Sequence, residues 1–125
     1  MSKHATLSAS GAARWLACTP SARLEEYFPE SQSDYADEGT AAHELAELTT
    51  SYWLGRISES DFEARRNELS HGKYYNTEMQ EHANDYASFV CKKLKETAES
   101  CADAFVELET RVDFSKYVKG GFGTC

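Results

Sequence analysis

The sequence predicts a mainly α-helical domain of four to five helices that ends in a short β-strand or hairpin. From about residue 11 to residue 100, apolar residues recur at three- and four-residue steps, which is the period of an amphipathic helix. Near residue 104 the apolar spacing changes to two, as in a half-buried strand. The alternating residues are Val106, Leu108, Thr110 and Val112. With 125 residues, 41% of them hydrophobic, the chain fits one domain spanning residues 1–125 with a modest core.

Two short helices are predicted near the N-terminus. The first covers about residues 11–17, with Ser8 or Ser10 as the N-cap, because a serine hydroxyl can accept a hydrogen bond from a free backbone N–H of the first turn. Pro20 ends this helix, since the residue before a proline disfavours the helical conformation. The second covers about residues 21–27.

Residues 28–38 contain Pro29 and many Ser and Asp residues, which predicts a loop. Thr40 then serves as the N-cap of a helix that runs to about Trp53, and Gly55 provides its C-terminal stop. One buried stripe is expected on this helix, made of Ala41, Leu45, Leu48 and Tyr52.

Two further helices precede the predicted strand. The first begins at Ser60 or Asp61 and ends near Gly72. The second is the longest, covers about residues 77–100 and is capped by Asn76 or by its own first residue. Its apolar register is Met79, Ala83, Tyr86, Val90, Leu94 and Ala98. After the strand, residues 115–121 form a turn, and Phe122 begins a partner strand.

The charge and the apolar pattern exclude several classes of protein. A net charge of −8 gives no overall attraction to nucleic acid, and the local groups at residues 65–66 and 92–95 are interpreted as solvated helix faces. No apolar run approaches the roughly 20 residues of a membrane span. The N-terminus lacks the apolar core of a secretory signal, and no Cys-x-x-Cys pair is present, so we expect a cytoplasmic protein with reduced thiols.

The segment from Asp37 to Glu47 is the candidate functional site, because it places His43 among four carboxylates on a predicted helix. Carboxylates and imidazole can bind a hard divalent cation of the kind used in phosphate chemistry. His43 and Glu47 are four residues apart, so their side chains can converge on one side of the helix. In the alternative interpretation His43 is a surface histidine paired with Glu47, while Glu38 and Glu47 are favourable charges near a helix start or solvated residues.

Three segments together resemble one group of proteins: residues 7–21, residues 35–47, and Glu109–Phe114 followed by residues 121–124. They are similar to the N-terminal half of phage and prophage proteins in the PD-(D/E)XK nuclease superfamily, close to RecB-type exonucleases and the CRISPR-associated adaptation nucleases. The resemblance implies a partial α/β nuclease fold, DNA as the partner of the full-length proteins, and His43 as a ligand of magnesium or manganese. Glu38 and Glu47 are secondary candidates for that metal.

The resemblance also implies that the catalytic site is incomplete in these residues. The next ligand of the family is an aspartate directly after a Gly-Thr-x element, which matches Gly123-Thr124-Cys125. The Glu/Asp-x-Lys element of the third strand is absent from the sequence. We therefore expect the N-terminal portion of a phage-type metal-dependent DNA exonuclease-like protein that does not cleave DNA by itself, with an aspartate following Cys125 in a longer form.

Cys18 matches the first cysteine of an iron–sulfur cluster found in some members of the superfamily. The resemblance implies a cluster only together with the C-terminal half of the family's domain, so no cluster is expected in this chain. Without a cluster, Cys18 is interpreted as a small core residue, because free cysteine buries readily.

The alternative function belongs to a different class. An acidic protein can occupy a basic nucleic-acid channel, so a nuclease-derived chain could act as an interaction protein, for instance an inhibitor of a host CRISPR or recombination nuclease. An exposed C-terminal strand would also provide an edge for a host protein or for a homodimer. A helical remnant without biochemical activity is the third interpretation.

Overall fold

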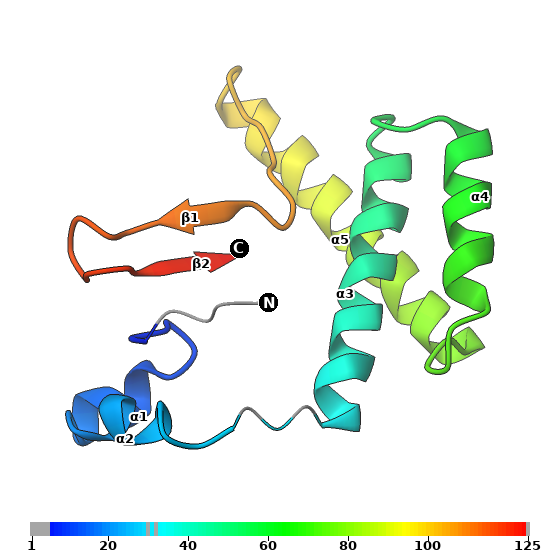
Figure 1. Ribbon diagram of the computed structural model, residues 1–125. Helices are drawn as coiled ribbons and strands as arrows, with labels where there is room; N and C mark the ends of the chain where they lie inside the picture. The colour runs from blue at the N-terminus through cyan, green and yellow to red at the C-terminus, as the bar shows by residue number, and fades with distance from the viewer. Residues whose placement is uncertain (1–5, 30, 32, 125) are drawn as a thin grey trace. The chain divides into compact units, whose positions relative to one another are not determined.

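The computed structural model describes residues 6–29, residue 31 and residues 33–124, and these residues confirm the mainly helical prediction (Figure 1). They form five helices and one two-stranded antiparallel hairpin. The elements are α1 (Ala12–Ala17), α2 (Ser21–Glu25), α3 (Asp34–Trp53), α4 (Glu59–Ser70), α5 (Thr77–Ser100), β1 (Arg111–Asp113) and β2 (Phe122–Thr124). None of the described helices combines the length and the apolar character that a membrane span requires.

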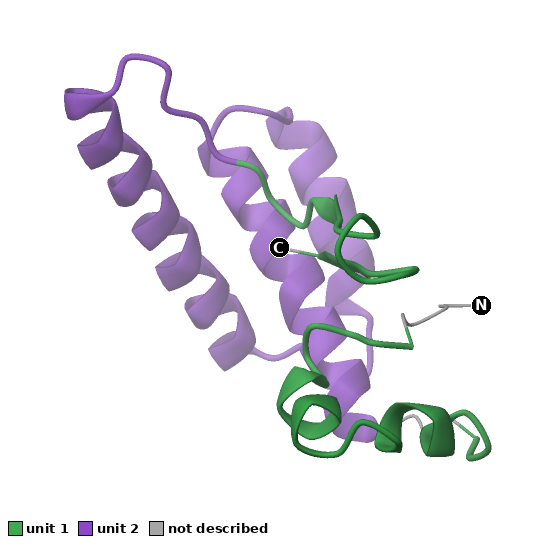
Figure 2. Cartoon of the chain, turned by 90° about the vertical axis from the view of Figure 1, so that its left-hand side faces the viewer, with its two compact units in different colours: residues 1–31, 107–125 green, residues 32–106 purple. Residues whose placement is uncertain are grey.

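The chain divides into two compact units (Figure 2). Residues 1–31 and 107–125 make up one unit, which contains α1, α2 and the hairpin, and residues 32–106 make up the other, which contains α3, α4 and α5. The single domain expected from the sequence stays a prediction, and we describe each unit by itself.

The helical unit is built around α3, which packs against both α4 and α5. Its buried residues are Leu45, Thr49 and Thr50 on α3, Phe62 on α4, and Ala83, Ala87 and Val90 on α5. The small alanines at positions 83 and 87 allow α5 to approach α3 closely. Of the stripe predicted on α3, Leu45 is buried, whereas Ala41, Leu48 and Tyr52 are only half-buried.

Two threonines of α3 are fully buried, which the apolar pattern does not predict. The hydroxyl of Thr49 donates to the carbonyl of Leu45 at 2.8 Å, and that of Thr50 donates to the carbonyl of Ala46 at 2.7 Å. Each hydroxyl is therefore satisfied within its own helix and can be buried without an unpaired polar group.

The predicted N-cap of α3, Thr40, is wrong, because the helix begins at Asp34 and its N-cap lies seven residues before Thr40. Ser33 is the N-cap, and its Oγ accepts a hydrogen bond from the N–H of Ala36 at 3.2 Å. Thr40 lies inside the helix, where its hydroxyl donates back to the carbonyl of Ala36 at 3.0 Å. The C-terminal end agrees with the prediction, since α3 ends at Trp53 and Gly55 has a positive φ of 73°.

The other helix ends follow their capping side chains. Asn76 caps α5 as predicted, with its Oδ1 accepting from the N–H of Met79 at 2.8 Å. The predicted start of α4 at Ser60 or Asp61 is one or two residues late, because the helix begins at Glu59. Its cap is Ser58, whose Oγ accepts from the N–H of Asp61 at 3.1 Å. Ser10 is not a cap of α1.

In the other unit, the N-cap of α1 is Gly11 rather than Ser8, although the Oγ of Ser8 accepts from the N–H of Gly11 at 3.1 Å. The indole Nε1 of Trp15 donates to the carbonyl of Ser8 at 2.8 Å, which folds the preceding turn onto the helix. An ion pair of 2.6 Å between Arg14 and Glu25 joins α1 to α2.

The hairpin is shorter than the alternating pattern predicts. β1 contains only Arg111–Asp113, and Arg111, Val112 and Asp113 pair with Thr124, Gly123 and Phe122. Glu109 has a φ of 48°, a left-handed conformation that interrupts an extended strand. Val106 and Leu108 are half-buried as the alternation predicts, but residues 106–110 form no strand, and all three residues of β1 are exposed. The prediction of a half-buried strand over residues 106–112 is therefore wrong.

Candidate functional site

Helix α3 places the three predicted metal ligands on one continuous scaffold of 20 residues. His43 and Glu38 are exposed, and Glu47 is half-buried. Because α3 begins at Asp34, the acidic residues in its first turn are Asp34 and Asp37, and Glu38 lies just beyond it. Asp34 and Asp37, rather than Glu38, are therefore the carboxylates that interact favourably with the positive end of the helix dipole.

The period of the α-helix determines which of these side chains can converge. Successive residues are rotated by about 100°, so His43 and Glu47 are about 40° apart around α3, whereas His43 and Glu38 are about 140° apart. His43 and Glu47 thus lie on one side of the helix, and Glu38 lies on another. Within the described part of the chain, no three His, Cys, Asp or Glu side chains are grouped so that they could hold a metal ion. His43 and Glu47 can supply at most two ligands from this helix, and their role as ligands stays a prediction.

Glu47 also lines a pocket of about 360 Å³ between α3 and α4. Glu44 and Arg65 lie in the same pocket, so a guanidinium and two carboxylates share it. Arg65 is already paired with Glu68, with 2.7 Å between Nη1 and Oε2. The remaining lining residues are Leu48, Ser51, Ile57 and Leu69. The carboxylate of Glu47 can therefore take part either in this pocket, with Glu44 and Arg65, or in a metal site with His43.

The Gly-Thr element lies in β2, where Gly123 pairs with Val112 and Thr124 pairs with Arg111. It belongs to the unit of residues 1–31 and 107–125, whereas His43 belongs to the unit of residues 32–106. Cys125 lies outside the described residues, and the aspartate expected after it is not among the 125 residues of the sequence.

Cys18 is the C-cap of α1 and is exposed. Its interpretation as a buried core residue is therefore wrong: the backbone of α1 ends there, and the side chain is left accessible. Cys91 is half-buried and Cys101 is exposed. The iron–sulfur role that the resemblance implies for Cys18 stays a prediction for a longer form.

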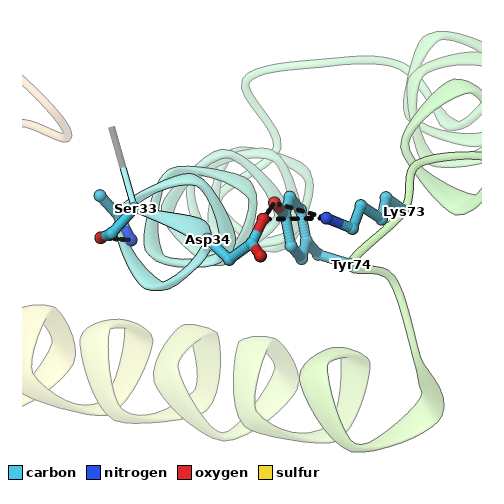
Figure 3. A network of polar contacts seen from close by, with 5 residues as sticks. Ser33, Asp34, Lys73 and Tyr74 are labelled. Atoms are coloured by element: carbon cyan, nitrogen blue, oxygen red, sulfur yellow. Dashed lines mark hydrogen bonds and ion pairs between the residues drawn. The ribbon is translucent and has the colours of Figure 1, made fainter. Parts of the chain in front are cut away.

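The apolar pattern missed a polar network at the start of α3 (Figure 3). The Oδ1 of Asp34 accepts from the Nζ of Lys73 and from the hydroxyl of Tyr74, each at 2.9 Å. The Lys73 hydrogen bond, followed by that of Tyr74, lowers the pKa of the Asp34 carboxyl from its ordinary value. The same hydrogen bond raises the pKa of Lys73, and the bond to Asp34 raises the pKa of Tyr74. The network links the first turn of α3 to the α4–α5 connection, in which Lys73 and Tyr74 lie.

A protein-family model with the description "Protein of unknown function (DUF2800)" matches residues 4–125 of this chain. No solved structure matches the chain.

Proposed function

The chain belongs to the DUF2800 family, and we propose that it is the N-terminal portion of a phage-type, metal-dependent DNA exonuclease-like protein to which it contributes His43 as a metal ligand. The observation that supports the proposal most directly is the placement of His43, exposed on a long capped helix with Glu47 one turn further along the same side. A helix fixes the backbone positions of both residues, which suits a metal site better than a loop does.

The donor set fits one arm of a magnesium or manganese site. His43 offers an imidazole nitrogen, and Glu47 offers a carboxylate oxygen, which are ligand types that manganese accepts. A bound divalent ion would polarise a phosphoryl oxygen and lower the pKa of a bound water. The resemblance assigns the remaining ligands to a strand aspartate and a Glu/Asp-x-Lys element beyond these residues. For that reason, His43 and Glu47 alone are expected to bind metal weakly and to cleave no DNA.

Manganese titration of the chain, followed by calorimetry, tests the proposal. His43→Ala should weaken binding at least about tenfold, which is what the loss of even an outer-shell partner of a metal typically costs. His82→Ala is the matched control, because His82 on α5 is an exposed histidine with a carboxylate, that of Glu78, at i,i+4 spacing. Titrations that are identical for wild type and His43→Ala would remove the metal role and with it the proposal. Sequencing the gene past codon 125 gives a second test, since the next codon should encode aspartate.

The second candidate function is a phage interaction protein that inhibits a host CRISPR or recombination nuclease. It is favoured by the net charge of −8 together with the two-stranded sheet, in which each strand has one partner among the described residues. The outer edges of such a sheet can receive a strand from a host nuclease or from a second copy of the chain. If purified chain recovers no nuclease or nucleic-acid-handling protein from host lysate, and runs as a monomer in light scattering, this candidate is rejected.

A further inference from the structure

The C-terminal hairpin differs in charge from the rest of this acidic chain. Residues 111–124 carry three cationic side chains, Arg111, Lys116 and Lys119, and one carboxylate, Asp113, whereas the whole chain has a net charge of −8. All three cationic side chains are exposed. The hairpin is therefore a local cationic surface in a protein that otherwise repels polyanions.

The tip of the hairpin is closed by its own hydrogen bonds. The N–H of Phe114 donates to the carbonyl of Gly121 at 3.1 Å, and the N–H of Gly121 donates to the carbonyl of Val118 at 2.7 Å. Between them, the N–H groups of Tyr117 and Val118 both donate to the carbonyl of Phe114. The ring of Phe114 covers Gly121 so closely that an added Cβ would lie 2.6 Å from it. These contacts form a compact loop that fixes the course of the backbone over residues 115–119.

The carboxylate of Asp113 is engaged within the loop. Its Oδ1 accepts a hydrogen bond from the N–H of Ser115 at 2.8 Å. Hydrogen bonds from Ser115 and, less strongly, the nearby charge of Arg111 lower the pKa of the Asp113 carboxyl. The carboxylate keeps its charge, which Arg111 offsets, while Lys116 and Lys119 add two further positive charges. The cationic side chains therefore dominate the charge of the hairpin tip.

Aromatic rings accompany these cations. Tyr117 is 81% exposed, and the Nζ of Lys116 lies 5.7 Å from the centroid of its ring. On the strands, the guanidinium carbon of Arg111 lies 4.0 Å from the centroid of Phe122. An exposed ring next to a cation can stack on a base while the cation contacts the phosphate of the same nucleotide.

We propose that the hairpin tip binds single-stranded nucleic acid, with Lys116 and Lys119 on the phosphates and Tyr117 stacked on an unpaired base. A single strand fits better than a duplex, because the faces of paired bases are not available to an external ring. An acidic peptide would satisfy the lysines but would leave the exposed face of Tyr117 without a partner. The inference rests on the proposed function, because the bound strand would be the substrate of the nuclease. Binding of the strand at the tip itself requires no metal.

Fluorescence anisotropy with a short labelled oligo(dT), in EDTA and at low salt, tests the inference. Tyr117→Ala should weaken binding about tenfold, since stacking on one aromatic side chain contributes on that order. In the double variant Lys116→Ala/Lys119→Ala, the negative slope of log affinity against log salt should become shallower by about 1.4. Two phosphate contacts are lost, and each contributes about 0.7 to the slope on a single strand. Tyr35→Ala and Lys92→Ala/Lys95→Ala are matched controls, since Tyr35 is 86% exposed and both lysines are exposed on α5. Both controls should bind as the wild type does.

Several results would overturn the inference: no binding by the wild type, equal losses in the tip variants and the controls, or a duplex that binds as tightly as the single strand. Competition by oligoglutamate as strong as by oligo(dT) would assign the tip to acidic polymers instead. His43→Ala should bind oligo(dT) normally in EDTA. If the tip variants bind oligo(dT) like wild type while His43→Ala has lost manganese binding, the inference fails and the proposed function stands. If the tip variants lose oligo(dT) binding while His43→Ala binds manganese like wild type, the inference stands and the proposed function fails.

Discussion

The rings of Tyr52 on α3 and Phe62 on α4 stack face to face, with their centroids 4.4 Å apart and their planes 9° apart. Phe62 is the only residue of α4 in the buried core of the described chain. Phe62→Ala should lower the free energy of unfolding by about 3 kcal/mol, because it removes a buried ring and leaves a cavity. Phe105→Ala is the control, since Phe105 is 79% exposed and its loss should change stability by less than about 0.5 kcal/mol. Equal urea midpoints for the two variants would show that the stack does not stabilise the unit.

A second pair of variants tests where α3 begins. Ser33→Ala removes the side chain that accepts from the N–H of Ala36, and should cost about 1 kcal/mol of unfolding free energy. Thr40→Ala removes only a hydroxyl that donates back to Ala36 within the helix, and should be neutral or slightly stabilising. Thermal or urea unfolding measures both. If Thr40→Ala is the more damaging change, the helix starts where the sequence pattern placed it.

The start of α3 shows what the sequence pattern can and cannot predict. Helix ends marked by a local signal agree with the prediction, such as Asn76 at the start of α5 and Gly55 after α3. Ser33 and Thr40 are both good N-caps, and Gly39 between them disfavours a helix by about 1 kcal/mol. The choice between the two depends on tertiary contacts, because Asp34 bonds to Lys73, 39 residues further along the chain. No local pattern contains that information.

The candidate site and the hairpin were predictable to different degrees. The four-residue spacing of His43 and Glu47 places them on one side of α3 wherever the helix starts. The position of Glu38 depends on the helix extending back past it, which the predicted start at Thr40 excluded. The length of β1 is limited by the left-handed conformation of Glu109, a residue type that gives no sign of a positive φ in the sequence.

Gly39→Ala should stabilise the chain by about 0.5–1 kcal/mol. Gly39 lies inside α3, and a Cβ built at this position meets no atom within 4 Å. Alanine would therefore gain helix propensity without a steric cost. A chemical denaturation curve measures the gain. Gly55→Ala is the opposing control, because Gly55 has a φ of 73° and alanine there would be strained; a stabilising Gly55→Ala or a destabilising Gly39→Ala would contradict the described course of α3.

The Asp34 network predicts a pH dependence at the acidic end. The hydrogen bond from Lys73 lowers the pKa of the Asp34 carboxyl below its ordinary value of 3.8, so its contribution to stability is present above that value. The contribution is lost as the pH falls through the lowered pKa, because the protonated carboxyl no longer pairs with Lys73. Asp34→Asn should thus melt at a lower temperature than wild type at neutral pH, and the difference should disappear in acid. Asp37→Asn removes the other first-turn carboxylate, which acts on Lys73 only through its charge. A difference that stays constant from neutral pH into acid would show that the charge of Asp34 is not involved.

Gly121→Ala should disrupt the hairpin tip without touching any residue proposed to contact nucleic acid. A Cβ on Gly121 would lie 2.6 Å from the ring of Phe114 and 2.8 Å from the carbonyl oxygen of Val118, so one of them must move. Overpacking of this kind typically costs about 1–3 kcal/mol, and the loss should appear as faster amide hydrogen exchange at Tyr117 and Val118. Gly123→Ala is the control, because its nearest neighbour, the ring of Phe114, is 3.6 Å from the added Cβ, an ordinary contact.

If the loop pre-organises Lys116 and Tyr117, Gly121→Ala should also weaken oligo(dT) binding, whereas Gly123→Ala should not. Faster exchange with unchanged binding would mean that the closed conformation of the tip makes no contribution to binding.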